Sequence, residues 1–288
     1  MKTAFVLSGG GNLGAVQAGM LQALQRADIR PDFIVGTSVG ALNGGWLAGR
    51  GPMADLGELA ALWQGLRRTD VFPTQLLGGL LGFVGRADHL VSDSGLRKIL
   101  KHHLGFERLE DARIPVHVVA TNLLTGVDVL LSRGDAVDAI CASAAIPGVF
   151  PSVQVNDMTL VDGGVVNNCP ISHAVALGAT TVWVLPCGYA CALDKPPRGA
   201  LGTALQAVSL LVQQRLRHDA ERYADACQLH IAPVLCPVSI PPTDFSHADR
   251  LIADAAALTT SWLLDPAAER SRSVDSLGPH AHALAHRH

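Results

Sequence analysis

The feature that most constrains the fold of this chain is a repeated alternation between short apolar runs and longer segments with helical spacing. Residues 15–26, for example, place Ala18, Leu21 and Leu24 on one face of a helix. Strands that alternate with helices build mostly parallel sheets covered on both faces. The sequence therefore predicts an α/β protein with three α/β/α layers around a mostly parallel central sheet.

The predicted elements follow from apolar periodicity and from glycine and proline breaks. Strands are expected at residues 3–8, 32–35, 116–121, 127–131, 153–155, 159–161, 180–185 and 229–231, and helices at 15–26, 39–47, 56–66, 96–104, 135–145, 170–177, 201–226 and 247–264.

Composition indicates one large, well-packed domain. Of the 288 residues, 49% are hydrophobic and only 16% are charged, against about 25% charged in ordinary proteins. We expect a single domain over residues 1–266, followed by a polar, His-rich, disordered tail at 267–288. A net charge of −3 excludes the broad basic surface that nucleic-acid binding needs. It does not exclude membrane contact through an apolar surface, and the oligomeric state is left open.

The sequence favours a cytoplasmic protein that can contact the inner face of the membrane. The apolar run after Lys2 is too short for an export signal. The uncharged run 174–193 is long enough to suggest a membrane span, but Gly178 and Pro186 divide it into helix, turn and buried strand. Six cysteines without paired CxxC motifs are then expected to be reduced and mostly buried.

The glycine-rich segment GGGNLG at residues 9–14 follows a strand and opens a helix. Successive backbone N–H groups at such a turn bind a phosphate or a developing oxyanion. The segment fits the dinucleotide fingerprint, but no acidic residue follows about 20 residues on to hold a ribose. A nucleotide-binding module and a simple packing turn remain as alternatives.

The segment GTSVG at residues 36–40 is a G-x-S-x-G motif between a predicted strand and a predicted helix. That context is typical of a turn that exposes a nucleophilic serine, here Ser38, with room provided by Gly36 and Gly40. A purely structural turn is the alternative.

A third segment ends an apolar strand at Asp162 and continues with Gly163 and Gly164. An Asx turn would explain the acid, and a general base at the carboxyl end of the sheet is the functional alternative. Ligands bind at that edge in open α/β sheets. A Ser-acid-His triad is a further alternative, since His173, His230 and His247 all follow Asp162.

Taken together, these segments resemble the patatin-like phospholipase family. The resemblance rests on LSGGGNLGA at 7–15, GTSVG at 36–40, ASAAIP at 142–147 and VDGGVVNN at 161–168. It implies a lipid acyl hydrolase that releases fatty acids with a Ser38–Asp162 dyad. The oxyanion hole would be formed by Gly9, Gly10 and Gly11. The other glycines of the three motifs would allow the turns around these residues; they are Gly14, Gly36, Gly40, Gly163 and Gly164.

The resemblance implies lipid or ester substrates, and we expect no metal or organic cofactor. Many members carry Arg or Lys where this chain has Leu13. Backbone oxyanion donors do not depend on that side chain, whereas attraction of a phosphate headgroup does. The uncharged, glycine-broken stretch at 71–85 is expected to be either an apolar flap beside the site or a buried connection.

Overall fold

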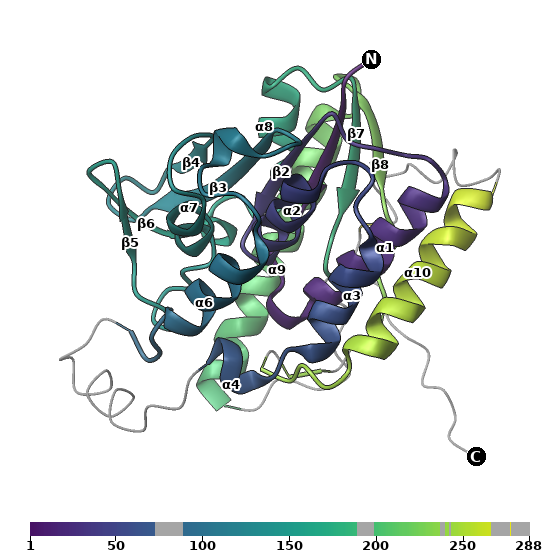
Figure 1. Cartoon of the computed structure of the whole chain (residues 1–288). Coiled ribbons are helices and arrows are strands. Elements are labelled where there is room, and N and C mark those ends of the chain that lie inside the picture. The colour runs from purple at the N-terminus through teal and green to yellow at the C-terminus, as the bar shows by residue number, and fades with distance from the viewer. Residues whose placement is uncertain (73–88, 189–198, 237–239, 242, 266–276, 278–288) are drawn as a thin grey trace.

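The computed structural model describes residues 1–72, 89–188, 199–236, 240, 241, 243–265 and 277. Over these residues the chain forms one eight-stranded sheet between two layers of helices, which confirms the expected α/β/α fold (Figure 1).

The sheet order is β5-β6-β3-β2-β1-β7-β8, with β4 also paired to β3. Strands β3, β2, β1, β7 and β8 are mutually parallel, whereas β4, β5 and β6 extend the sheet in antiparallel fashion. The strands are β1 (Thr3–Leu7), β2 (Phe33–Thr37), β3 (Val116–Asn122), β4 (Asp128–Leu131), β5 (Val153–Val155), β6 (Met158–Asp162), β7 (Thr181–Leu185) and β8 (Gln228–Ile231).

Alternate strand side chains enter two separate cores. Phe5, Leu7 and Ile34 pack on the face covered by α1, α2, α3, α6, α7 and α10. Val6 and Val35 pack on the face covered by α8 and α9. The helices are α1 (Gly14–Arg26), α2 (Val39–Arg50), α3 (Leu56–Gly65), α4 (Arg68–Val71), α6 (Ser94–His103), α7 (Ala136–Ser143), α8 (Ile171–Ala176), α9 (Gly199–Tyr223) and α10 (Ala248–Leu264).

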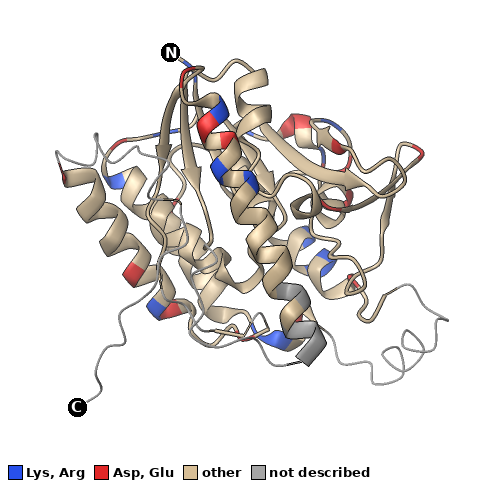
Figure 2. Cartoon of the chain, turned by 180° about the vertical axis from the view of Figure 1, so that it is seen from behind, with Lys and Arg blue, Asp and Glu red and all other residues tan. Residues whose placement is uncertain are grey.

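Charge distribution follows this layering. The five parallel strands contain no Lys, Arg, Asp or Glu, and Figure 2 shows the charged residues on the outer helices and loops. Buried parallel strands are apolar on both faces because helices cover both.

The predicted elements occur in the predicted order, with ends that differ by a few residues. The run 174–193 begins in α8 and continues through β7. Sequence periodicity missed the four-residue α4 and three 3₁₀ turns, Gly11–Leu13, Leu109–Asp111 and Gly163–Val165, because one turn carries no period.

Several expectations lie wholly or partly outside the described residues. Residues 73–85 of the expected flap are outside, as is the tail 267–288 apart from Leu277. Leu277 is buried beside Leu216 and Ala220, and its carbonyl oxygen accepts a hydrogen bond from Gln213 Nε2 at 3.0 Å.

The cysteines correct one expectation. Cys141, Cys169 and Cys187 are free and buried as expected. Cys236, in contrast, is disulfide-bonded, so the expectation of reduced thiols is wrong there. Cysteine spacing along a chain does not reveal which sulfurs the fold brings together.

Candidate active site

Ser38 occupies a sharp turn between β2 and α2. Its backbone has φ 55° and ψ −125°, an unusual conformation for a residue other than glycine. A Cβ on Gly36 would collide with the backbone of Gly40, and a Cβ on Gly40 would collide with the backbone of Leu7. The spacing of the two glycines is therefore a steric requirement of this turn.

A buried serine supports the turn from the neighbouring helix. Ser143 Oγ accepts a hydrogen bond from the Ser38 N–H at 2.8 Å and donates to the Val119 carbonyl oxygen at 2.5 Å. Ser143 is fully buried. The Ser38 N–H, which lies outside the β2 ladder, thus has a partner inside the protein.

Asp162 ends β6 and lies beside Ser38. Ser38 Oγ donates a hydrogen bond to Asp162 Oδ2 at 2.7 Å, and the Gly164 N–H donates to Oδ1 at 2.7 Å. Both Ser38 and Asp162 are 6% exposed. Burial raises the pKa of the Asp162 carboxyl from 3.8 to about 6, although the hydrogen bonds from Ser38 and Gly164 act in the opposite direction.

The glycine-rich segment lies against the same pair. A Cβ on Gly9 would lie 3.1 Å from Ser38 Cβ. The Gly9 N–H donates to the Asn168 carbonyl oxygen at 3.1 Å, so it is already occupied. Gly10 and Gly11 are exposed, and their N–H groups have no acceptor within the described part of the chain.

A chain of buried polar side chains fixes this glycine segment. Gln17 Nε2 donates to the Ser8 carbonyl oxygen at 2.9 Å. Asn43 Nδ2 donates to the Gly14 carbonyl oxygen at 3.0 Å and to Gln17 Oε1 at 2.9 Å. Trp63 Nε1 donates to Asn43 Oδ1 at 2.9 Å. The conformation of the loop is thereby tied to three helices.

The loop is also anchored to a distant part of the chain. Asn12 Nδ2 donates to the carbonyl oxygens of Pro241 and Asp244, at 2.9 and 2.7 Å. Leu13, at the position where many patterns of this kind carry Arg or Lys, packs against the apolar core.

The three histidines considered for a triad contact other groups. His173 Nε2 lies 2.8 Å from Asp128 Oδ2, the His230 ring stacks on Trp183 at 4.2 Å, and His247 Nε2 lies 3.5 Å from Asp244 Oδ2. Ser38 contacts the Asp162 carboxylate directly, without an intervening imidazole.

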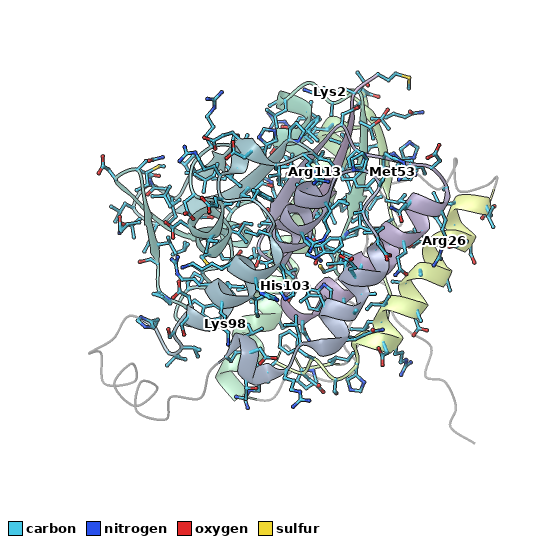
Figure 3. The ribbon with its side chains drawn as sticks, viewed as in Figure 1. Lys2, Arg26, Met53, Lys98, His103 and Arg113 are labelled. Atoms are coloured by element: carbon cyan, nitrogen blue, oxygen red, sulfur yellow. The ribbon has the colours of Figure 1, made fainter. Side chains whose placement is uncertain are left out.

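An apolar cavity of about 460 Å³ opens beside Ser38. It lies among α2, α3, α4, α6 and the segment before α10, and Leu42, Trp46, Trp63 and Phe245 contribute to its walls. His103 of α6 lines it as well, and Figure 3 shows this residue near the middle of the molecule. Val71 and Phe72, the described residues of the expected flap, also line the cavity.

Sequence patterns did not reveal several of these residues. Ser143 was visible only inside the ASAAIP string, and Asn43 and Trp63 only as members of amphipathic helices. Their contacts cross many residues of sequence, 105 in the case of Ser38 and Ser143. Local periodicity contains no signal for such pairs.

No metal centre is evident in the part of the chain that the structure describes. No group of three or more His, Cys, Asp or Glu side chains there is arranged to hold a metal ion. Among the same residues, no helix has the length and hydropathy needed to cross a bilayer.

A family model covers the part of the chain that contains the candidate site. The family model described as "Patatin-like phospholipase" matches residues 5–175, more than half of the chain. The chain belongs to the patatin-like phospholipase family. The matched region includes the glycine segment, Ser38, Ser143 and Asp162. The expected family is thus confirmed.

Curated relatives of this family match the same part of the chain. "Lysophospholipase NTE1" of Saccharomyces cerevisiae is 28% identical over 193 residues, covering 64% of this chain and 11% of the relative. An "Uncharacterized NTE family protein" of Mycobacterium tuberculosis is 32% identical over 183 residues, covering 62% of this chain and 47% of the relative. The chain therefore spans between about a tenth and a half of these relatives.

Solved structures with a similar backbone include VipD from Legionella pneumophila. The alignment has a TM-score of 0.48 and 16% sequence identity, and it covers 90% of this chain and 66% of the VipD chain.

Proposed function

We propose that this chain is a serine lipid acyl hydrolase, of phospholipase A, lysophospholipase or carboxylesterase type. Ser38 is the nucleophile and Asp162 the general base. The observation that carries the proposal is the direct Ser38–Asp162 hydrogen bond of 2.7 Å, with Ser38 lining an apolar cavity. The matched family and the names of the curated relatives support a lipid ester as substrate.

The geometry accounts for the chemistry as follows. Ser38 Oγ attacks the ester carbonyl carbon while its proton passes to Asp162 Oδ2. With a pKa of about 6, Asp162 is ionised at neutral pH and is a stronger base than an ordinary carboxylate. The tetrahedral oxyanion accepts hydrogen bonds from the Gly10 and Gly11 N–H groups, contacts worth about 3 kcal/mol each where measured.

Collapse of the tetrahedral intermediate breaks the ester bond to the alcohol, which leaves with the proton from Asp162. The acyl-enzyme on Ser38 is then attacked by water, whose proton Asp162 accepts. A second oxyanion forms and collapses, the fatty acid leaves, and Ser38 recovers its proton. This cycle requires no histidine.

The surroundings of Ser38 suggest how a lipid would be held. The apolar cavity would take the acyl chain, since about 460 Å³ is within the usual range of ligand pockets. A second groove of about 610 Å³ shares Leu66, Thr243 and Phe245 with that cavity. Arg67 and Arg68 line this groove, together with Asp244 and Asp249. The two guanidinium groups would bind a phosphate-bearing headgroup in place of the contact that Leu13 cannot make.

Contact with a membrane surface would be transient and local. The apolar residues Val71, Phe72 and Ile146 line the cavity, and Ile146 is 38% exposed. These side chains can meet the edge of a lipid layer while an acyl chain enters the cavity. A cytoplasmic location with contact at the inner membrane face remains part of the proposal.

The proposal is tested by labelling the purified protein with a fluorophosphonate and mapping the modified peptide. The expected adduct is on Ser38, and Ser38→Ala abolishes it, whereas Ser152→Ala labels like the wild type. Ser38→Ala, Asp162→Asn and the double variant should be similarly inactive toward a short acyl ester, because residues that act as a unit lose activity non-additively.

Asp157→Asn, an exposed turn position of the same residue type, is the matched control for Asp162→Asn. An adduct elsewhere in the chain, or near-wild-type turnover by a folded Asp162→Asn variant, would exclude the dyad.

A further inference from the structure

Asn167 contacts the chain next to both members of the proposed dyad. Its backbone N–H donates to the Gly163 carbonyl oxygen at 2.8 Å. Its carbonyl oxygen accepts a hydrogen bond from Thr37 Oγ1 at 3.0 Å. Gly163 follows Asp162 and Thr37 precedes Ser38. The backbone of one residue therefore joins the segment that carries the acid to the segment that carries the serine.

The side chain of Asn167 is held from outside these two segments. It is fully buried, and its Nδ2 donates to Asp128 Oδ2 at 2.7 Å and to Ser172 Oγ at 3.0 Å. Asp128 is the first residue of β4 and Ser172 lies on α8. Because a carboxylate only accepts hydrogen bonds, the amide must turn its nitrogen toward Asp128, which fixes its orientation.

Asp128 is itself fixed by a histidine. His173 Nε2 on α8 lies 2.8 Å from the same Asp128 oxygen. This histidine therefore pairs with Asp128 and not with Ser38 or Asp162. Burial raises the pKa of Asp128, but the hydrogen bonds from Asn167 and His173 and the charge of His173 outweigh it, so the pKa lies below its usual value. His173 also faces His117 of β3, whose pKa is lowered by burial and by the charges of Lys2 and His173.

We propose that Asn167, anchored by Asp128, is a positioning residue that holds the Asp162 segment and the Ser38 segment in register. This inference rests on the proposed function of the dyad. Ser38 is held by Ser143 on one side, and the Asn167–Thr37 bond holds the preceding residue on the other. A small shift between these segments lengthens the Ser38–Asp162 hydrogen bond through which the proton moves.

The test replaces the anchoring amide with a carboxyl group. In Asn167→Asp, two carboxylates face each other at positions 128 and 167 when both are ionised, and they repel. Two carboxyls in one site raise the pKa of one of them strongly. At lower pH that group holds a proton and donates its O–H to the other, which restores a hydrogen bond like that of the amide.

The measurement is kcat and KM for a short, soluble acyl ester at about pH 8 and about pH 5.5, always as a ratio to wild type at the same pH. We expect kcat at the higher pH to fall on the order of 10- to 100-fold with KM unchanged, as a displacement of about 1 Å costs. The ratio should recover at the lower pH. Asn156→Asp, in the β5–β6 turn, is the control for an added charge.

A swap variant, Asp128→Asn with Asn167→Asp, keeps one amide and one carboxylate in contact and should recover activity at about pH 8. A defect in Asn167→Asp that is equal at both pH values, or a wild-type rate, overturns the proposal. If the single variant does not fold by circular dichroism, the swap decides, because only an anchoring pair predicts its recovery. Absence of turnover and Ser38 labelling in the wild type would instead reject the proposed function.

Discussion

Replacing Asp162 with asparagine should stabilise the folded protein while it abolishes turnover. The Asp162 carboxyl is 6% exposed, and burial raises its pKa from 3.8 to about 6. The native state therefore binds the proton more tightly than the unfolded state. As pH rises from about 4 to about 6, the unfolded carboxyl is ionised and the folded one is not, so the free energy of unfolding falls.

The size of this effect follows from the shift in pKa. A difference of about two units corresponds to about 3 kcal/mol at 1.36 kcal/mol per unit. Above pH 6 ionised Asp162 lowers the free energy of unfolding of the wild type by this full amount, and below pH 4 it does not lower it. An amide does not titrate, and asparagine can still accept from Gly164 while it donates to Ser38 Oγ.

Urea unfolding of wild type and Asp162→Asn, followed by circular dichroism at about pH 4 and pH 7, measures the difference. We expect the stability of the variant relative to wild type to rise by about 3 kcal/mol between these pH values. Asp157→Asn should show no such change. A relative stability that is the same at both pH values would mean that Asp162 ionises normally, and the argument from burial would be wrong.

Three further predictions concern catalysis. The value of kcat/KM should fall as pH drops below 6, to about a tenth at pH 5, because Asp162 must be ionised to act as a base; a constant rate to pH 5 would contradict this. His230→Gln and His247→Gln should each retain most of the activity, and a loss of 10³-fold or more in a folded variant would support a triad instead. The double variant Arg67→Gln with Arg68→Gln should lower kcat/KM about tenfold or more for a lysophospholipid but not for a monoacylglycerol with the same acyl chain. Equal losses on both substrates would place the arginines outside headgroup binding, with Arg26→Gln as the distant control.

The sequence was sufficient to predict what depends on local pattern. The order of strands and helices follows from periodicity. The turn at Ser38 follows from Gly36 and Gly40, where a side chain would collide with neighbouring backbone. The end of β6 at Asp162 was equally visible. Each of these features depends on residues that are close together in the sequence.

What could not be predicted depends on contacts between distant residues. Nothing local marks Ser143 as the partner of the Ser38 N–H, nor Asn168 as the acceptor that occupies the Gly9 N–H. The latter contact narrows the proposed oxyanion donors to Gly10 and Gly11. The raised pKa of Asp162 also could not be predicted, since it depends on how completely the folded chain excludes water.

The anchoring of the glycine loop by Asn12 makes catalytic activity a reporter of complete folding. Asn12 is bound by residues 229 and 232 positions later in the chain, and Gln17 by one 168 positions later. Contacts of such high sequence separation form late, since chain closure must precede them. During refolding, turnover should return after the helical circular dichroism signal, and simultaneous recovery would show that the loop assembles without its distant anchors. A fragment that ends at residue 178 would retain Ser38 and Asp162 but lack the carbonyl groups of residues 185, 241 and 244 that anchor the glycine loop.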